Sequence, residues 1–117
     1  MRRFFALLIL SVLALPLSAE QWVRVNLLGY LPDAVKVAVL MSEDAVTPNG
    51  FVLHEAISGA AVQRFDKVRP CGAFGQMQST FRLDFSAFKK SGSYYIEAAG
   101  VKSPVFRINA DAYDGTA

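Results

Sequence analysis

The sequence has few of the residues from which enzymes most often build reactive sites. It contains one cysteine, Cys71, and one histidine, His54. A single cysteine excludes a disulfide within the chain, and a structural metal site needs clustered His and Cys residues. We expect Cys71 to be a free, partly buried thiol, in preference to a bond with a partner outside the chain.

An excess of one charge is also missing once the N-terminus is set aside. The chain has 12 Lys and Arg against 10 Asp and Glu, and two of the basic residues are Arg2 and Arg3. Without these two residues the chain is close to neutral. A near-neutral chain gives no support for nucleic acid or an anionic membrane surface as a partner.

Residues 1–19 have the layout of a secretory signal peptide: a basic start, an apolar stretch over residues 4–17, and small residues before position 20. The apolar stretch is shorter than the roughly 17–25 residues of a membrane-spanning helix, so an uncleaved anchor is the less favoured alternative. The absence of a cysteine near position 20 argues against a lipid-anchored lipoprotein. We predict cleavage after Ala19 and a secreted or periplasmic protein without a membrane contact after cleavage.

Helical periodicity is nearly absent after residue 20, and a period of two replaces it. In residues 80–85, three apolar side chains alternate with Thr80, Arg82 and Asp84, which is typical of a half-buried antiparallel strand. Similar runs occupy residues 23–27, 37–40, 51–57, 62–65, 94–98 and 105–108. Turn residues separate these runs, so the pattern predicts an all-β sandwich of about seven strands. In residues 51–57, Phe51, Leu53 and Ile57 alternate less cleanly with Val52, His54 and Ala56. We expect a long loop over residues 69–79.

Two positions predict the shape of the strand connections. Gly29 allows a backbone conformation that other residues resist, and Pro32 fixes the following turn, so residues 24–40 are interpreted as the first corner of a scaffold. Tyr94 opens a late strand after Ser91 and Gly92. By analogy with sandwich domains, its hydroxyl can return to the preceding loop as a tyrosine corner.

No reactive constellation emerges from the sequence. A catalytic triad would have to use His54, and a lone strand histidine is better interpreted as a bystander. Residues 72–75 lack the Lys and the Ser or Thr of a phosphate loop. Asp111 and Asp114 could share a helix face as a carboxylate pair, but we favour the interpretation that they begin a helix. We therefore assign no catalytic residue, no metal ligand and no cofactor.

Stacked aromatic side chains are the remaining route to a carbohydrate site. Six residues could serve: Trp22, Tyr30, Phe74, Tyr94, Tyr95 and Tyr113. A sandwich core also consumes aromatic residues, so the sequence leaves both roles open.

The residues described so far resemble a known module. Residues 25–34 (VNLLGYLPDA) and 36–40 (KVAVL) resemble the opening of the N-terminal immunoglobulin-like domain of family 9 glycoside hydrolases, the cellulase family. Residues 84–86, 92–96 and 103–108 are similar to the end of that domain, and residues 111–114 to the hinge before the catalytic domain. The resemblance departs from the family at Leu27, where Gln is frequent, and in residues 69–78, which have no clear counterpart.

The resemblance implies three parts: a signal peptide over residues 1–19, an immunoglobulin-like β-sandwich over 20–110, and the start of a hinge over 111–117. The family's catalytic base comes from an Asp-x-Gly-Asp motif in an all-helical barrel, and the motif is not matched here because residues 111–114 carry Tyr113 in place of Gly. We therefore expect a non-catalytic module of a truncated or split polysaccharide-degrading enzyme.

The expected partner is the family 9 catalytic domain, in cis or in trans, which this module would support. The resemblance suggests a docking surface that uses exposed groups at Tyr30, Leu31, Asp111 and Tyr113, whereas Gly29, Pro32 and Tyr94 would shape turns and corners. Ordinary packing within the sandwich is the alternative role for the docking residues. The alternative function is a free-standing secreted β-sandwich that binds polysaccharide or protein.

Overall fold

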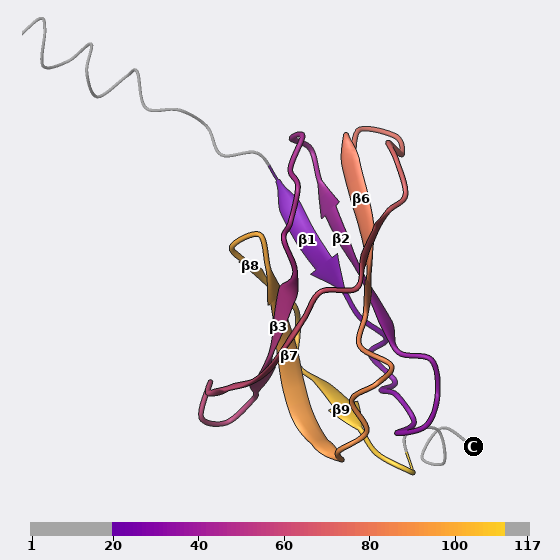
Figure 1. Cartoon of the computed structure of the whole chain (residues 1–117), viewed down its shortest axis with the longest axis vertical. Helices are drawn as coiled ribbons and strands as arrows, with labels where there is room; N and C mark the ends of the chain where they lie inside the picture. Colours follow the sequence, from indigo (N-terminus) through magenta and orange to yellow (C-terminus); the bar gives the residue numbers. More distant parts are fainter. Residues whose placement is uncertain (1–19, 112–117) are drawn as a thin grey trace, which may run out of the picture.

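A computed structural model describes residues 20–111, which form two β-sheets packed face to face (Figure 1). Within these residues there is no helix, and nine strands are present: β1 (Gln21–Arg24), β2 (Val37–Ser42), β3 (Phe51–Glu55), β4 (Ala61–Phe65), β5 (Val68–Pro70), β6 (Ser79–Asp84), β7 (Gly92–Ala98), β8 (Val101–Lys102) and β9 (Phe106–Ile108). The predicted all-β sandwich is confirmed. The predicted signal peptide, Tyr113 and Asp114 lie outside the described residues.

All pairings between the named strands are antiparallel, and an isolated parallel bridge joins Tyr30 to Ile108. Sheet A has the order β1-β2-β6-β5, and sheet B has the order β4-β3-β7-β8, with β9 also paired to β7. The two strands beyond the predicted seven are β5 and β8, which are too short to show an alternation. The loop expected over residues 69–79 shortens to 71–78, because Arg69 and Pro70 belong to β5. Pro70 is tolerated there because β5 is an edge strand.

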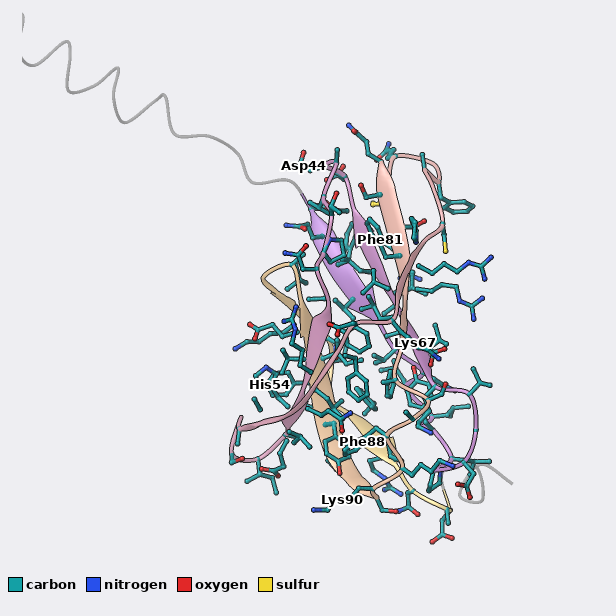
Figure 2. All side chains as sticks on the ribbon, viewed as in Figure 1. Asp44, His54, Lys67, Phe81, Phe88 and Lys90 are labelled. Carbon is teal, nitrogen blue, oxygen red and sulfur yellow. The ribbon has the colours of Figure 1, made fainter. Side chains whose placement is uncertain are left out.

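The core lies between the two sheets and is built from alternate residues of each strand. Along β2 the burial alternates strictly, and along β6 Phe81 and Leu83 point inward as predicted. Phe85 is fully buried, and its ring lies against those of Tyr30, Phe51 and Phe106, with centroids 5.1, 6.4 and 5.5 Å away. Figure 2 shows Phe81 and Phe88 between the two layers.

The alternation expected over residues 51–57 does not extend to Ile57, which is 93% exposed, whereas Phe51 and Leu53 are buried. Strand β3 ends at Glu55, whose carboxylate accepts hydrogen bonds from the backbone amides of Ile57 and Ser58, at 3.2 and 2.9 Å. This turn carries the chain into β4 and removes Ile57 from the alternation.

Candidate functional site

The expected exposure of Tyr30 is wrong, because its side chain is only 5% exposed. Its hydroxyl accepts a hydrogen bond from the Asn26 amide and donates one to the Val37 carbonyl, each at 2.9 Å. Its backbone amide donates to the Arg107 carbonyl at 2.8 Å, and its carbonyl accepts from Asn109 at 3.0 Å. Tyr30 therefore ties the first corner of sheet A to the segment around β9, and its ring is core rather than docking surface.

The other residues of this corner shape the chain. Gly29 has a φ of 98°, a conformation that glycine adopts at little cost, and its amide donates to the Asn26 carbonyl at 3.0 Å. Leu31 and Pro32 are half-buried. The Pro32 carbonyl accepts a hydrogen bond from the ammonium of Lys36. The corner is thus closed by its own polar groups.

Lys36 is a fully buried lysine that the sequence reasoning did not single out. Its ammonium also donates to the Ala34 carbonyl at 3.0 Å. Burial lowers the pKa of Lys36, and the nearby Lys89 lowers it further, whereas Asp33 and Asp84 oppose the change. Two backbone carbonyls, rather than a carboxylate, are the hydrogen-bond acceptors of this ammonium, so its role is to hold the corner.

Tyr94 makes the contact that defines a tyrosine corner. Its hydroxyl lies 3.1 Å from the Lys90 carbonyl oxygen and 3.2 Å from that of Ser91, so one proton serves both acceptors. Burial raises the pKa of Tyr94, and the negative charge of Glu55 adds to the effect. The hydroxyl therefore stays protonated and holds the turn before β7.

The described chain ends beside the first corner. Asp111 is exposed, and its amide donates to the Asn109 side-chain oxygen at 2.8 Å. The Asn109 amide in turn donates to the Tyr30 carbonyl, so the described chain ends close to this corner. The predicted partners of Asp111, which are Tyr113 for docking and Asp114 for the carboxylate pair, lie outside the described residues.

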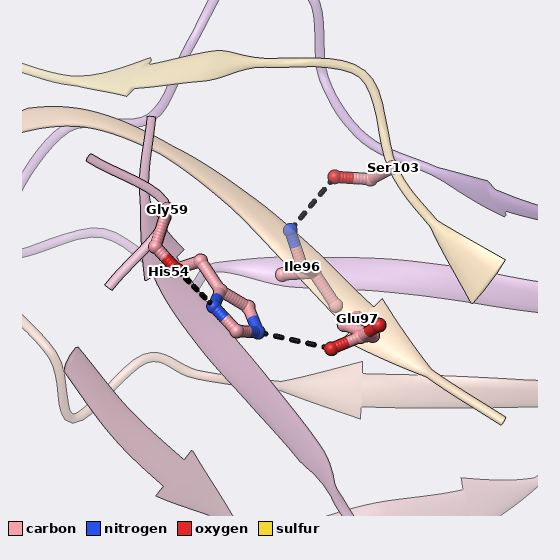
Figure 3. Close-up of polar contacts among 5 residues, drawn as sticks. All are labelled: His54, Gly59, Ile96, Glu97 and Ser103. Carbon is pink, nitrogen blue, oxygen red and sulfur yellow. Dashed lines mark hydrogen bonds and ion pairs between the residues drawn. The ribbon is translucent and has the colours of Figure 1, made fainter. Parts of the chain in front are cut away.

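His54 is fully occupied by structural contacts (Figure 3). Nδ1 lies 2.9 Å from the Gly59 carbonyl oxygen and Nε2 lies 3.1 Å from Oε1 of Glu97. Its ring stacks on that of Tyr95, with centroids 4.9 Å apart. Both ring nitrogens therefore join β3, β7 and the turn before β4.

Cys71 differs from its expected environment, because it is exposed rather than partly buried. It lies directly after β5, at the start of the 71–78 loop. Among residues 20–111, no group of three His, Cys, Asp or Glu side chains could hold a metal ion. The described segment also holds no helix long and apolar enough to cross a membrane.

The outer face of sheet A carries an apolar stripe along its second strand. The buried side of this segment holds Lys36, Ala38, Leu40 and Ser42. The opposite side carries Val35, Val37, Val39 and Met41, of which Val35 is 73% exposed and the others are half-buried. Outward faces of antiparallel sheets usually carry polar residues, so this stripe is unusual for a surface in water.

Arginines border this apolar stripe. The strand register places Arg24 of β1 and Arg82 of β6 on either side of Val39, and Arg69 of β5 beyond Arg82. All three arginines are exposed. The ion pairs found in the described part of the chain are His54–Glu97, Arg64–Asp66 and Lys89–Asp33, so none includes these arginines.

One carboxylate lies close to Arg24, Arg82 and Arg69, which together form the arginine row. Asp84 follows Arg82 by two residues on the same side of β6, and Ser86 donates its amide to Asp84 Oδ1 at 2.9 Å. Hydrogen bonding from Ser86 lowers the pKa of Asp84, and the positive charges of Lys67 and Arg82 lower it further. The face as a whole remains cationic.

An open groove of about 500 Å³ lies where the edges of the two sheets meet, between β1 and the segment around β8. Trp22, 40% exposed, forms part of its wall together with Gln21 and Lys102. The Gln21 side-chain oxygen is buried without a hydrogen-bond partner. The groove thus exposes an aromatic ring, whereas the Gln21 oxygen is buried.

The sequence itself contains a signal for the apolar stripe. Residues 37–41 are apolar at every position, not at every second one. A strand that is apolar on both sides is typical of burial on both faces. The arginine row gave no comparable signal, because Arg24, Arg69 and Arg82 come from three strands.

These features define a class of protein domain: an immunoglobulin-like β-sandwich whose described residues present surfaces for contact rather than an assembled reactive group. The sequence pattern of the family described as the cellulase N-terminal ig-like domain matches residues 18–103. The chain belongs to this family.

Solved structures with the same fold come from family 9 enzymes. A Bacteroides ovatus GH9 protein is 29% identical with a TM-score of 0.64, and the match covers 80% of this chain and 16% of that one. A single mutant of a thermostable endoglucanase from Alicyclobacillus acidocaldarius is 23% identical with a TM-score of 0.65, over 80% and 16%. A metagenome-derived glycoside hydrolase family 9 endoglucanase is 22% identical with a TM-score of 0.61, over 76% and 18%.

The matches therefore cover only a small part of these much longer proteins. The two less similar structures support the fold alone. No curated protein matches the chain.

Proposed function

We propose that this chain is the non-catalytic N-terminal immunoglobulin-like module of a secreted family 9 glycoside hydrolase, and that it supports the catalytic domain of that enzyme. The family match over residues 18–103 carries the proposal. The Bacteroides ovatus protein supports it, because the matched region is 16% of a longer chain. The substrate class of the parent enzyme would be a cellulose-type polysaccharide.

The fold suits a supporting role. Its core is continuous between two sheets, and the two tyrosine hydroxyls of Tyr30 and Tyr94 hold corners at the end of the sandwich from which the chain leaves. A segment that follows Asp111 starts from a rigid base, because Asn109 is bonded to Tyr30. The module would thus fix the position at which the catalytic domain begins, or receive that domain in trans.

The decisive experiment is to determine the nucleotide sequence that follows the codon for Ala117. An open frame that encodes a family 9 catalytic domain, with an Asp-x-Gly-Asp motif, is the expected result. A stop codon with no such domain nearby would contradict the proposal of a truncated enzyme in cis.

The chain by itself should lack hydrolytic activity. His54 is engaged on both ring nitrogens, and the exposed Cys71 has no histidine beside it to act as its base, because His54 lies on the other sheet. We expect purified chain to release no more sugar from a soluble β-glucan than a blank. Release above the blank that survives repurification would overturn the non-catalytic assignment.

Secretion is the second part of the proposal. Its support is the sequence layout of residues 1–19 alone. After export from a bacterial host, mass spectrometry of the secreted chain should give an N-terminus at Glu20. Recovery of the uncut chain from the cell pellet would contradict this assignment.

A free-standing module that binds polysaccharide is the alternative, and the groove beside Trp22 is the observation that favours it. A partly exposed indole offers a ring face on which a sugar could stack. Retention of the chain on insoluble cellulose, lost on Trp22→Ala, would support this alternative. Passage of the chain through cellulose without retention would remove it.

A further inference from the structure

The outer face of sheet A has the composition of an interface rather than that of a solvated surface. Its centre is the stripe of Val35, Val37, Val39 and Met41, and its border holds Arg24, Arg69 and Arg82. Protein interfaces combine an apolar centre with a polar rim, and they are enriched in Met and Arg. We propose that this face, which we call the valine face, is where the catalytic domain docks, on an apolar patch bordered by carboxylates; this rests on the proposed function.

The position of the chain end supports this partner. The ribbon leaves β9 and passes beside the loop that precedes β2, as Figure 1 shows. The hydrogen bond of 3.0 Å between Asn109 and Tyr30 fixes this proximity. Val35, the most exposed residue of the stripe, belongs to the same loop. A domain that follows Asp111 therefore starts at one end of the valine face and needs no long linker to cover it.

The size of the face also fits a contact between domains. Four strands at about 4.8 Å spacing and a central strand of roughly 20 Å give about 300 Å² of flat area before side-chain relief. Interfaces between domains of one chain bury about 600–1,500 Å² over both partners. The valine face therefore matches the lower part of this range on its side.

Other occupants fit the face less well. A second copy of the chain would bring two rows of arginines together, and like charges repel. A neutral sugar offers no charge to pair with the arginines, although Trp22, opposite Met41 on the edge strand β1, offers one ring on which a sugar could stack. A carboxylate-bordered protein patch satisfies both parts of the face, because guanidinium groups bind carboxylates in a bidentate manner.

A chimera tests the inference. The whole chain replaces the matched N-terminal region of the Bacteroides ovatus GH9 protein, and the melting temperature of the remainder of that protein is measured with and without the module. Two sheet A variants, Val39→Glu and Arg82→Glu, are compared with two sheet B controls, Val52→Glu and Arg107→Glu. Val52 is half-buried on the outer side of β3, and Arg107 is exposed on β9, so the changes are chemically matched.

We expect the unaltered chain to raise the melting temperature, and both sheet A variants to remove most of that increase while the controls keep it. Circular dichroism of each variant chain checks folding. The milder Val39→Thr, which keeps the side-chain shape, should remove a smaller part of the increase. If the sheet A and sheet B variants lose the melting-temperature increase equally, or if only the sheet B variants lose it, the proposal that the valine face is the docking surface is wrong.

The two proposals fail in different ways. If the unaltered chain does not raise the melting temperature, the supporting role is wrong, and so is the proposal that the valine face is the docking surface. If the unaltered chain gives the increase and the sheet A variants retain it, the supporting role stands and the docking face is wrong.

Discussion

The charged side chains on the outer faces of the two sheets are arranged in opposite ways. On sheet B, Glu97 lies 3.1 Å from His54 and opposite Lys102, whose ammonium lies 5.7 Å from the Tyr95 ring centroid. On sheet A, Arg69 and Arg82 are directly opposite each other. On sheet B, Glu97 lies beside groups that attract it, whereas sheet A places two arginines opposite each other next to an apolar stripe.

The difference indicates that the outer face of sheet B is satisfied within the isolated chain, whereas the outer face of sheet A is not. Both sheets pack on one core, so the contrast does not arise from different demands of folding. Like charges opposite each other on a sheet are destabilising. The arrangement on sheet A is therefore unfavourable in isolation and becomes favourable when acidic groups cover it. The predictions below separate what the two faces share from what distinguishes them.

The largest effect is expected from Phe85→Ala, which removes the ring that both sheets share. Phe85 is fully buried between rings of the corner, β3 and β9, and large-to-small core changes of Phe cost about 3–5 kcal/mol. Urea unfolding should show this loss. A cost below about 1 kcal/mol would mean that the two faces do not share one cooperative core.

A smaller loss is expected from Tyr30→Phe, which loosens sheet A at its corner and leaves the backbone bonds to Arg107 and Asn109 intact. The change leaves the Asn26 amide and the Val37 carbonyl without the hydroxyl, which costs about 1–3 kcal/mol. Urea unfolding measures the loss, and hydrogen exchange should quicken at the corner and stay slow in β3 and β7. Uniform acceleration in both sheets would contradict a role local to sheet A.

Much of this architecture could be predicted from the sequence, because alternation reports which side of a strand is buried. Residues 80–85 alternate cleanly in sequence, and the structure follows this alternation from Phe81 onward, whereas Thr80 is buried as well. Ile57 shows where the pattern ends, because the Glu55 carboxylate closes a turn that the alternation does not reveal. Strands β5 and β8 are too short to carry a period.

The surfaces could be predicted less well, since they depend on contacts between distant segments. Tyr30 has the character of an exposed turn residue, yet β9, more than seventy positions later, buries it. Lys36 is buried because the preceding turn supplies two carbonyls. The arginine row exists only in the register of four strands.

Asp84 is the carboxylate beside the arginines of sheet A, and its substitution tests how much its charge contributes to stability. Hydrogen bonding from Ser86, aided by Lys67 and Arg82, lowers the pKa of Asp84 below its ordinary value of 3.8. The folded state therefore favours the carboxylate, whose contribution is present above that value and is lost as the pH falls through the folded pKa. Asp84→Asn should cost about 1 kcal/mol at neutral pH.

The cost of Asp84→Asn should shrink on acidification, because the unaltered chain then loses the same charge. Urea unfolding of both chains at neutral pH and near pH 3 measures this change. A cost that is independent of pH would mean that the amide replaces the carboxylate for reasons of packing, with no electrostatic share.

The smallest expected change in unfolding free energy comes from reversing one charge on each sheet, and the two variants should differ in the sign of that change. Arg69→Glu converts the pair with Arg82 into opposite charges and should stabilise the chain by about 0.2–1 kcal/mol. Lys102→Glu makes the mirror change on sheet B, because it sets a carboxylate opposite Glu97 and should destabilise by a similar amount. Both side chains are exposed, so urea unfolding reads charge pairing rather than packing.

Salt provides the control for this pair of variants. Charge effects at exposed positions weaken as the Debye length falls from about 10 Å at 0.1 M to about 3 Å at 1 M ionic strength. Both changes in unfolding free energy should therefore approach zero at high salt. If Arg69→Glu destabilises the chain at low salt, the arginine row is not unfavourable in isolation, and the contrast between the two faces loses its electrostatic basis.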